Sequence, residues 1–164
     1  MELSIKSMTL FNAVLLTGLS AGLFYAWQVS VIPGTRKLID IHYLTTMQSI
    51  NRAILNPAFF LSFFGCLLLL CISTIQQYKT GATFWLLLSA TLSYLLGTFG
   101  VTIFGYVPLN DSLDILDLVE LAKSKEIPFR HTYEKKWNRL HLVRTAFSLM
   151  SFCFSILAIF FSSN

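Results

Sequence analysis

The side chains with the clearest capacity for chemistry lie in the last hydrophobic stretch of the chain. Trp137, His141, Arg144 and Ser148 are separated by four, three and four residues, so on a helix they share one face. An imidazole can exchange protons or bind a metal, and a guanidinium can hold an anion. Because polar groups inside a membrane mostly face the interior of a helix bundle, the pattern predicts a polar site on the inner face of this helix.

Arg144 needs an explanation of its own, because it lies two turns inside the hydrophobic stretch. An arginine at such a depth costs roughly 2.5–3.5 kcal/mol on membrane-insertion scales. It can belong to a site, or it can reach toward nearby lipid headgroups or bond to carbonyls where Pro108 interrupts a helix. The residue pattern leaves these alternatives open.

A second polar set is expected on the same side of the membrane. Its members are Asn51, Asn56, Thr98, Thr102 and Asn110. A four-helix bundle can gather such side chains at its mouth, where sites in bundles are often built. The alternative is that they form hydrogen bonds between helices and cap helix ends.

The sequence contains only weak patterns for a metal or cofactor site. His131 and Glu134 are spaced like one half of a carboxylate-bridged metal site, but the sequence has no second half. Asp40 and His42 are two residues apart and so do not share a helical face. The sequence contains no Gly-rich phosphate loop, GxSxG elbow or CxxC pair. We therefore expect no metal and no cofactor, with haem bound through His141 as a weaker alternative.

The elements that must position these residues follow from the distribution of charge. Of the 164 residues 55% are hydrophobic and 12% charged, whereas a soluble domain has about a quarter charged residues. Four long stretches carry no charge, and about 20 apolar residues suffice to cross a bilayer as a helix. The sequence therefore predicts an all-α integral membrane four-helix bundle that forms one domain over residues 1–164. The expected spans are about 8–32, 57–76, 82–107 and 132–161.

The connections have patterns of their own. Arg36–Leu55 is predicted to be an amphipathic helix before the second span, with the junction at Asn56-Pro57. Asp111–Lys125, with its acidic residues first and its lysines last, is predicted to be a short surface helix between the third and fourth spans. Pro33-Gly34 is expected to end the first span, which is too long for the apolar region of a signal peptide. Val107-Pro108 is expected to end the third.

Basic residues beside the spans predict the orientation. Lys6 and Lys79 lie on one side, and nine other basic residues lie on the opposite side. We therefore expect a multi-pass protein of the plasma (inner) membrane with both termini outside and the long connections in the cytoplasm. The net charge of +4 reflects this bias, so membrane lipid is an expected partner and nucleic acid is not.

Three groups of residues follow one another along nearly the whole chain. They are a glycine-bearing first helix closed by a proline (Gly18–Pro33), Met47-Gln-Ser-Ile-Asn51 followed by Asn56-Pro57-Ala-Phe59, and Val101-Thr102 with Val107–Asn110 and Trp137-x3-His141-x2-Arg144-Thr145. In their order and spacing the chain resembles the anthrone oxygenase-like family of small four-span membrane proteins. The family pattern usually has asparagine where His141 stands, so a mechanism based on this histidine would not transfer to the other members.

The resemblance implies oxidation of a tricyclic anthrone to an anthraquinone by O₂, with no metal or flavin evidently required. An anthrone has an acidic CH₂ group, and loss of its proton gives an anion that O₂ can attack. His141 would remove the proton, and Arg144, with Asn51 or Asn110, would stabilise the enolate oxygen. The substrate-binding residues would be Trp137, Asn56, Thr102 and Asn110.

A non-enzymatic role is the main alternative. The chain would then be a membrane bundle that binds a lipid or another hydrophobic small molecule, or a subunit of a membrane complex, and oligomers are possible. Coupled transport is less favoured, because the sequence has no detectable inverted repeat and no acidic residue deep in a span. Any site requires Asn51, Thr102, His141 and Arg144 to point inward and meet in a shared cavity.

Overall fold

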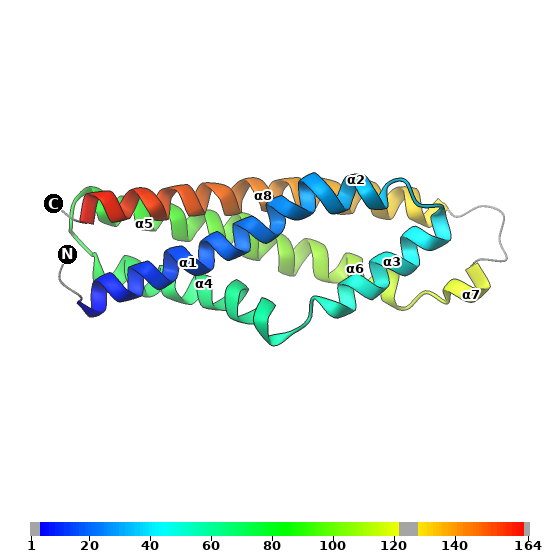
Figure 1. The fold of residues 1–164 in the computed structure, drawn as a ribbon, viewed down its shortest axis with the longest axis horizontal. Helices are drawn as coiled ribbons and strands as arrows, with labels where there is room; N and C mark the ends of the chain where they lie inside the picture. The colour runs from blue at the N-terminus through cyan, green and yellow to red at the C-terminus, as the bar shows by residue number, and fades with distance from the viewer. Residues whose placement is uncertain (1–3, 122–127, 163–164) are drawn as a thin grey trace.

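This computed structural model describes residues 4–121 and 128–162, and all the regular secondary structure among them is helical (Figure 1). In chain order the helices are α1 (Ile5–Ala26), η1 (Trp27–Val31), α2 (Ile32–Thr35), α3 (Asp40–Ala53), α4 (Pro57–Gln76), α5 (Ala82–Leu92), η2 (Ser93–Gly100), η3 (Thr102–Tyr106), α6 (Val107–Asp114), α7 (Leu118–Leu121) and α8 (Pro128–Ser162). The elements η1, η2 and η3 are π-helical.

Four helices are long and apolar enough to cross a membrane: Ile5–Thr35, Pro57–Gln76, Ala82–Asp114 and Pro128–Ser162. They pack side by side as a bundle, with the start of α1 and the end of α8 at the same end (Figure 1). α3 precedes the second span, and α7 lies between the third and fourth. The predicted fold class, an all-α four-helix bundle with these two additional helices, is confirmed.

The structure corrects two predicted helix ends, both of them at prolines. The sequence predicts that the first span ends at Pro33-Gly34 and the third at Val107-Pro108, but the helices continue to Thr35 and Asp114. A π-helical segment ends one residue short of each proline, and the N–H of the intervening residue, Ile32 or Val107, bonds to a carbonyl five residues back. This wider turn displaces the carbonyl that a proline ring would otherwise strike. The helix therefore passes through both prolines.

The surface helix predicted at Asp111–Lys125 is not a single helix, because the third span continues through Pro108 into its first residues. Its first residues belong to α6, which continues the third span, and only Leu118–Leu121 forms a separate helix. Residues 122–127 lie outside the described residues. The last helix begins at Pro128, earlier than the predicted start near residue 132.

Small and hydroxyl-bearing residues let the bundle helices approach closely. α8 packs against α1, α5 and η2, and its buried face includes Ser148 and Ser151. The Ser151 hydroxyl donates to the Ala90 carbonyl at 2.8 Å. A Cβ at Gly97 would lie 1.9 Å from Cγ of Phe147, so only glycine fits there. Such close contacts are typical of helices packed in membranes.

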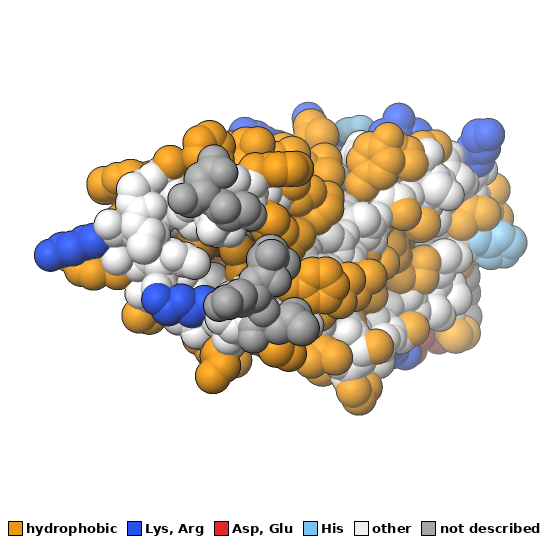
Figure 2. Space-filling model, turned by 60° about the vertical axis from the view of Figure 1, so that its left-hand side comes forward, with side chains coloured by type: hydrophobic (Ala, Val, Ile, Leu, Met, Phe, Trp, Pro, Cys, Tyr) orange, Lys and Arg blue, Asp and Glu red, His pale blue; other side chains and the backbone are white. Residues whose placement is uncertain are grey.

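The outer surface of the bundle is apolar. Figure 2 shows hydrophobic side chains over much of the visible surface, with Lys and Arg toward its margins. Leu68, Trp85 and Phe104 are each more than half exposed. Exposed aromatic and aliphatic side chains on every flank are expected where lipid, not water, surrounds the helices.

A cluster of buried hydrophobic side chains holds α3 at the end of the bundle remote from the termini. Tyr43 and Met47 of α3 pack there with Leu113 of α6 and with Tyr133 and Trp137 of α8. α3 thereby covers the end of the bundle where the polar residues of α8 lie.

Arg130 of α8 fixes the start of α3 electrostatically. Its guanidinium donates to the Leu38 carbonyl at 2.8 Å and to the Asp40 carboxylate at 2.6 Å. It also lies 4.7 Å from the centre of the Tyr43 ring. Hydrogen bonds from a charged group to partly buried acceptors are stronger than neutral ones, so Arg130 sets the position from which α3 reaches the site.

Candidate functional site

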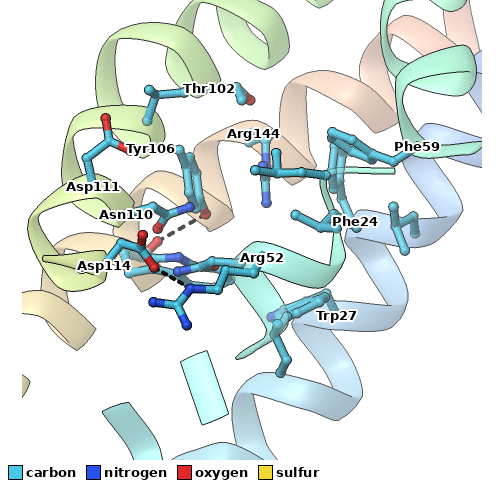
Figure 3. A pocket seen from close by; sticks show the side chains of 17 residues that line it. Phe24, Trp27, Arg52, Phe59, Thr102, Tyr106, Asn110, Asp111, Asp114 and Arg144 are labelled. Atoms are coloured by element: carbon cyan, nitrogen blue, oxygen red, sulfur yellow. Dashed lines mark hydrogen bonds and ion pairs between the residues drawn. The ribbon is translucent and has the colours of Figure 1, made fainter. Parts of the chain in front are cut away.

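A cavity of about 240 Å³ lies where α3, α6, the inner face of α1 and the start of α8 meet (Figure 3). Most of the side chains around it are apolar and many are aromatic. Five of the predicted site residues line it: Asn51, Thr102, Asn110, Trp137 and Arg144. Asn56 and His141, the other two predicted residues, are not part of the lining.

Arg144 is the central charged group of the cavity. Its side chain is buried, and its guanidinium lies 4.1 Å from the ring centre of Phe24 and 4.0 Å from that of Tyr106. Figure 3 shows Arg144 between these two rings. Its Nη2 bonds to Nδ1 of His141 at 3.1 Å, and no carboxylate among the described residues pairs with it. Cation–π contacts therefore take the place of a counter-ion.

His141 lies directly behind Arg144 and is fully buried. Because a guanidinium only donates hydrogen bonds, Nδ1 of His141 must accept from Arg144. The other ring nitrogen, Nε2, then carries the hydrogen and donates to the Phe24 carbonyl at 3.0 Å. His141 is thus the neutral tautomer with both nitrogens engaged, and its ring stacks on Trp137 at 5.1 Å. It holds the guanidinium in place and has no lone pair free for the cavity.

Two buried N–H groups of the lining have no acceptor in the described part of the chain: Nε of Arg144 and Nε1 of Trp137. An unsatisfied buried donor costs about 1–3 kcal/mol. Both residues border the same cavity, whose lining also includes the rings of Phe24 and Tyr106. The lining thus includes one positive charge and two side chains with an N–H group that no described residue accepts.

Tyr133 joins three elements at the edge of the cavity. The Asn51 amide of α3 donates to the Tyr133 hydroxyl at 3.0 Å, and this hydroxyl donates to Oδ1 of Asn110 at 3.1 Å. Tyr133 is buried and is not among the site residues predicted from the sequence. The signal was present, because Tyr133 lies four residues before Trp137 on the face that also carries His141.

We expect Tyr133→Phe to lower the free energy of unfolding by about 1–2 kcal/mol, because two hydrogen bonds of about 1 kcal/mol each are lost. Thermal unfolding of the detergent-solubilised protein measures this. Tyr78→Phe is the matched control, because Tyr78 is exposed at the opposite end of the bundle and should not change the melting temperature. Equal effects of both variants on the melting temperature would contradict a stabilising role for the hydrogen bonds of Tyr133 to Asn51 and Asn110.

The remaining predicted polar residues have local partners. Asn56 caps α4: its side chain accepts from the Phe59 N–H at 3.0 Å and donates to the Ala53 carbonyl at 2.9 Å. The Thr102 hydroxyl borders the cavity but donates to the Thr98 carbonyl in the preceding turn. The hydroxyl of Thr98 approaches the Arg144 carbonyl at 3.5 Å. For Asn56 the capping role considered from the sequence is therefore what the structure shows.

The outer part of the cavity carries opposite charges. Arg52 of α3 and Asp114 of α6 form an exposed ion pair at 2.6 Å, and Asp111 lies one turn before Asp114 on the same lining. Leu55, also in the lining, is largely exposed. The cavity thus passes from the buried Arg144 to a charged and partly apolar outer rim.

The carboxylate considered for metal binding with His131 forms ion pairs instead. Glu134 contacts Arg130 at 3.3 Å and Arg36 at 3.7 Å. Within residues 4–121 and 128–162, no three His, Cys, Asp or Glu side chains gather in an arrangement suited to a metal ion.

Comparison with known proteins gives one match. A family model described as anthrone oxygenase matches residues 45–154, which is 110 of the 164 residues and runs from within α3 to within α8. The matched region contains every predicted site residue. No curated protein and no solved structure matches the chain.

Proposed function

The chain belongs to the anthrone oxygenase family, and on this premise we propose that it binds a flat aromatic ketone in the Arg144 cavity and promotes its oxidation by O₂. The observation that carries the proposal is a buried guanidinium that borders an aromatic cavity without a carboxylate partner among the described residues. A cation so placed favours a ligand whose oxygen becomes negative during the reaction.

In this proposal the ketone oxygen accepts hydrogen bonds from Nε of Arg144 and Nε1 of Trp137. Loss of a proton from the CH₂ group opposite the ketone gives an enolate, whose negative oxygen the guanidinium stabilises. The enolate carbon then forms a bond to O₂, and the resulting peroxide loses water to leave a second carbonyl. One CH₂ group and one O₂ thus give one C=O group and one water.

The proton acceptor we favour is a carboxylate of the outer rim. Both nitrogens of His141 are engaged by Arg144 and Phe24, which supports a positioning role for this histidine. Two carboxylates line the cavity, and that of Asp114 is bonded to Arg52. Asp111 is therefore the lining carboxylate left to take the proton.

The proposed ligand is hydrophobic and reaches the cavity from the membrane. Leu23, Leu55 and Val107 belong to the lining and are also exposed on the outside of the bundle. A polycyclic ketone dissolves in the hydrocarbon and can enter past these side chains. The rings of Phe24, Tyr106 and Trp137 would then offer it stacking and edge contacts.

Four candidate membrane-spanning helices indicate a multi-pass membrane protein. We further propose that the protein lies in the plasma (inner) membrane and that the end bearing α3 and α6 faces the cytoplasm. The basic residues described at that end support this orientation: Arg36, Lys37, Arg52, Arg130, Lys135, Lys136 and Arg139.

The test is O₂ uptake by the purified protein in lipid nanodiscs supplied with anthrone. We expect uptake about 100-fold faster than in empty nanodiscs, with one anthraquinone formed per O₂ consumed and no loss of rate after treatment with a chelator. Tight anthrone binding with uptake no faster than in empty nanodiscs would contradict the oxygenase proposal. It would favour a bundle that binds a hydrophobic molecule without converting it.

A further inference from the structure

A second concavity, separate from the Arg144 cavity, runs along the outside of the bundle between the third and fourth spans. It is an open groove of about 640 Å³. The third span contributes Gly105, Pro108, Leu109 and Ser112. Their spacing of three, one and three residues places them in one stripe along the helix.

The fourth span contributes a matching stripe with the same spacing: Lys136, Arg139, Leu140 and Val143. The floor lies where the two stripes touch, since a Cβ at Gly105 would come within 3.0 Å of Leu140. Two facing stripes, with a glycine that leaves room between them, make a groove parallel to the helices.

The groove changes character along its length. The third and fourth spans run in opposite directions (Figure 1), so Ser112 and Lys136 lie at the outer end and Gly105 and Val143 at the inner end. The cationic groups of Lys136 and Arg139 occupy the outer half. The inner half offers only apolar surface, beside the exposed hydrophobic flank of the bundle.

Neither cation of the groove pairs with a carboxylate of residues 4–121 or 128–162. In the part of the chain that the structure describes, the carboxylates that form ion pairs do so with Arg36, Arg52 and Arg130. Lys136 and Arg139 are both exposed and form no such pair. The outer half of the groove therefore holds two cationic side chains without a carboxylate partner among the described residues.

We propose that this groove binds an anionic phospholipid, with its phosphate between Lys136 and Arg139 and an acyl chain along Leu140, Gly105 and Val143. A free phosphate ion would use only the outer half. A zwitterionic headgroup would bring its positively charged ammonium close to Lys136 and Arg139, and the like charges would repel each other. An anionic amphiphile matches both halves, and basic pockets between membrane helices are suited to such headgroups.

The test measures lipid binding by native mass spectrometry, with phosphatidylglycerol as the probe and phosphatidylcholine for comparison. The double variant Lys136→Gln/Arg139→Gln should bind phosphatidylglycerol about tenfold or more weakly. The control Lys79→Gln/Lys135→Gln removes the same charge outside the groove and should leave binding within about twofold. Val143→Trp, which fills the apolar half and keeps both cations, should also weaken phosphatidylglycerol binding.

Three results would overturn the proposal. Unchanged phosphatidylglycerol binding in the Lys136→Gln/Arg139→Gln variant would mean that the groove cations do not hold the lipid. Equal loss in the control variant would mean diffuse attraction to a basic surface. Full competition by inorganic phosphate, together with normal binding by Val143→Trp, would indicate a phosphate site and not a lipid site. None of these measurements uses anthrone, so the outcome is independent of the proposed oxygenase function.

Discussion

Anthrone-dependent O₂ uptake is expected to fall by about 100-fold or more when Arg144 is replaced by glutamine, because one preorganised donor to a developing oxyanion is worth about that factor. Arg144→Lys keeps the charge but loses the Nε–H group, which has no acceptor among the described residues. We expect it to recover part of the rate. Steady-state O₂ uptake in nanodiscs measures kcat for each variant.

The same substitution should not unfold the protein. A buried charge is costly in itself. Replacing it by an uncharged group of similar size is therefore often neutral or stabilising for the fold. We therefore expect the melting temperature of Arg144→Gln to equal or exceed that of the unmodified chain. Lys135→Gln, on the same helix but outside both the cavity and the groove, should keep its rate within about twofold. A normal rate in Arg144→Gln with a lowered melting temperature would show that Arg144 is structural.

His141 gives the second large effect, and the outcome depends on which residue replaces it. His141→Leu leaves Nη2 of Arg144 and the Phe24 carbonyl without their hydrogen bonds, so the guanidinium loses its fixed position. We expect kcat to fall by about 30- to 100-fold, since misplacing a group by about 1 Å can cost 100-fold. The rate and its dependence on pH are measured together.

His141→Asn separates positioning from proton transfer. An amide oxygen can accept from Arg144 while the amide N–H₂ donates to Phe24, so we expect a rate within about threefold and an unchanged pH profile. Asparagine is also what the family pattern usually has at this position. A general base would behave differently, because an amide cannot take the proton. Loss of turnover in His141→Asn would therefore restore the role as a base that the sequence suggested.

The sequence was sufficient for the bundle because the membrane imposes a simple rule. A stretch without charge that is long enough to cross a bilayer has to be helical, and four such stretches leave little freedom of architecture. The helix ends were harder to predict. Proline normally ends a helix, but π-helical turns before Pro33 and Pro108 absorb the disruption. Hydrophobic periodicity gives no indication of such turns.

The same contrast holds at the site. Helical spacing predicted Trp137 and Arg144 on one inner face. In the structure both line one cavity, which Asn51 and Asn110 reach from α3 and α6. Spacing says which face a side chain occupies, but it does not say which partner engages its hydrogen-bonding groups. That is why the bonds of His141 to Arg144 and Phe24 could not be foreseen from the sequence.

The central claim is that the unpaired charge of Arg144 faces the bound ligand. The most direct measurement is an anaerobic spectroscopic titration of anthrone bound in nanodiscs, which follows the absorbance of its enolate without allowing oxidation. We expect bound anthrone to ionise at a pH at least about one unit lower in the unmodified protein than in Arg144→Gln, because a nearby cation favours the anion. Identical titration curves for the two proteins would show that the guanidinium does not act on the ligand, and would contradict the account.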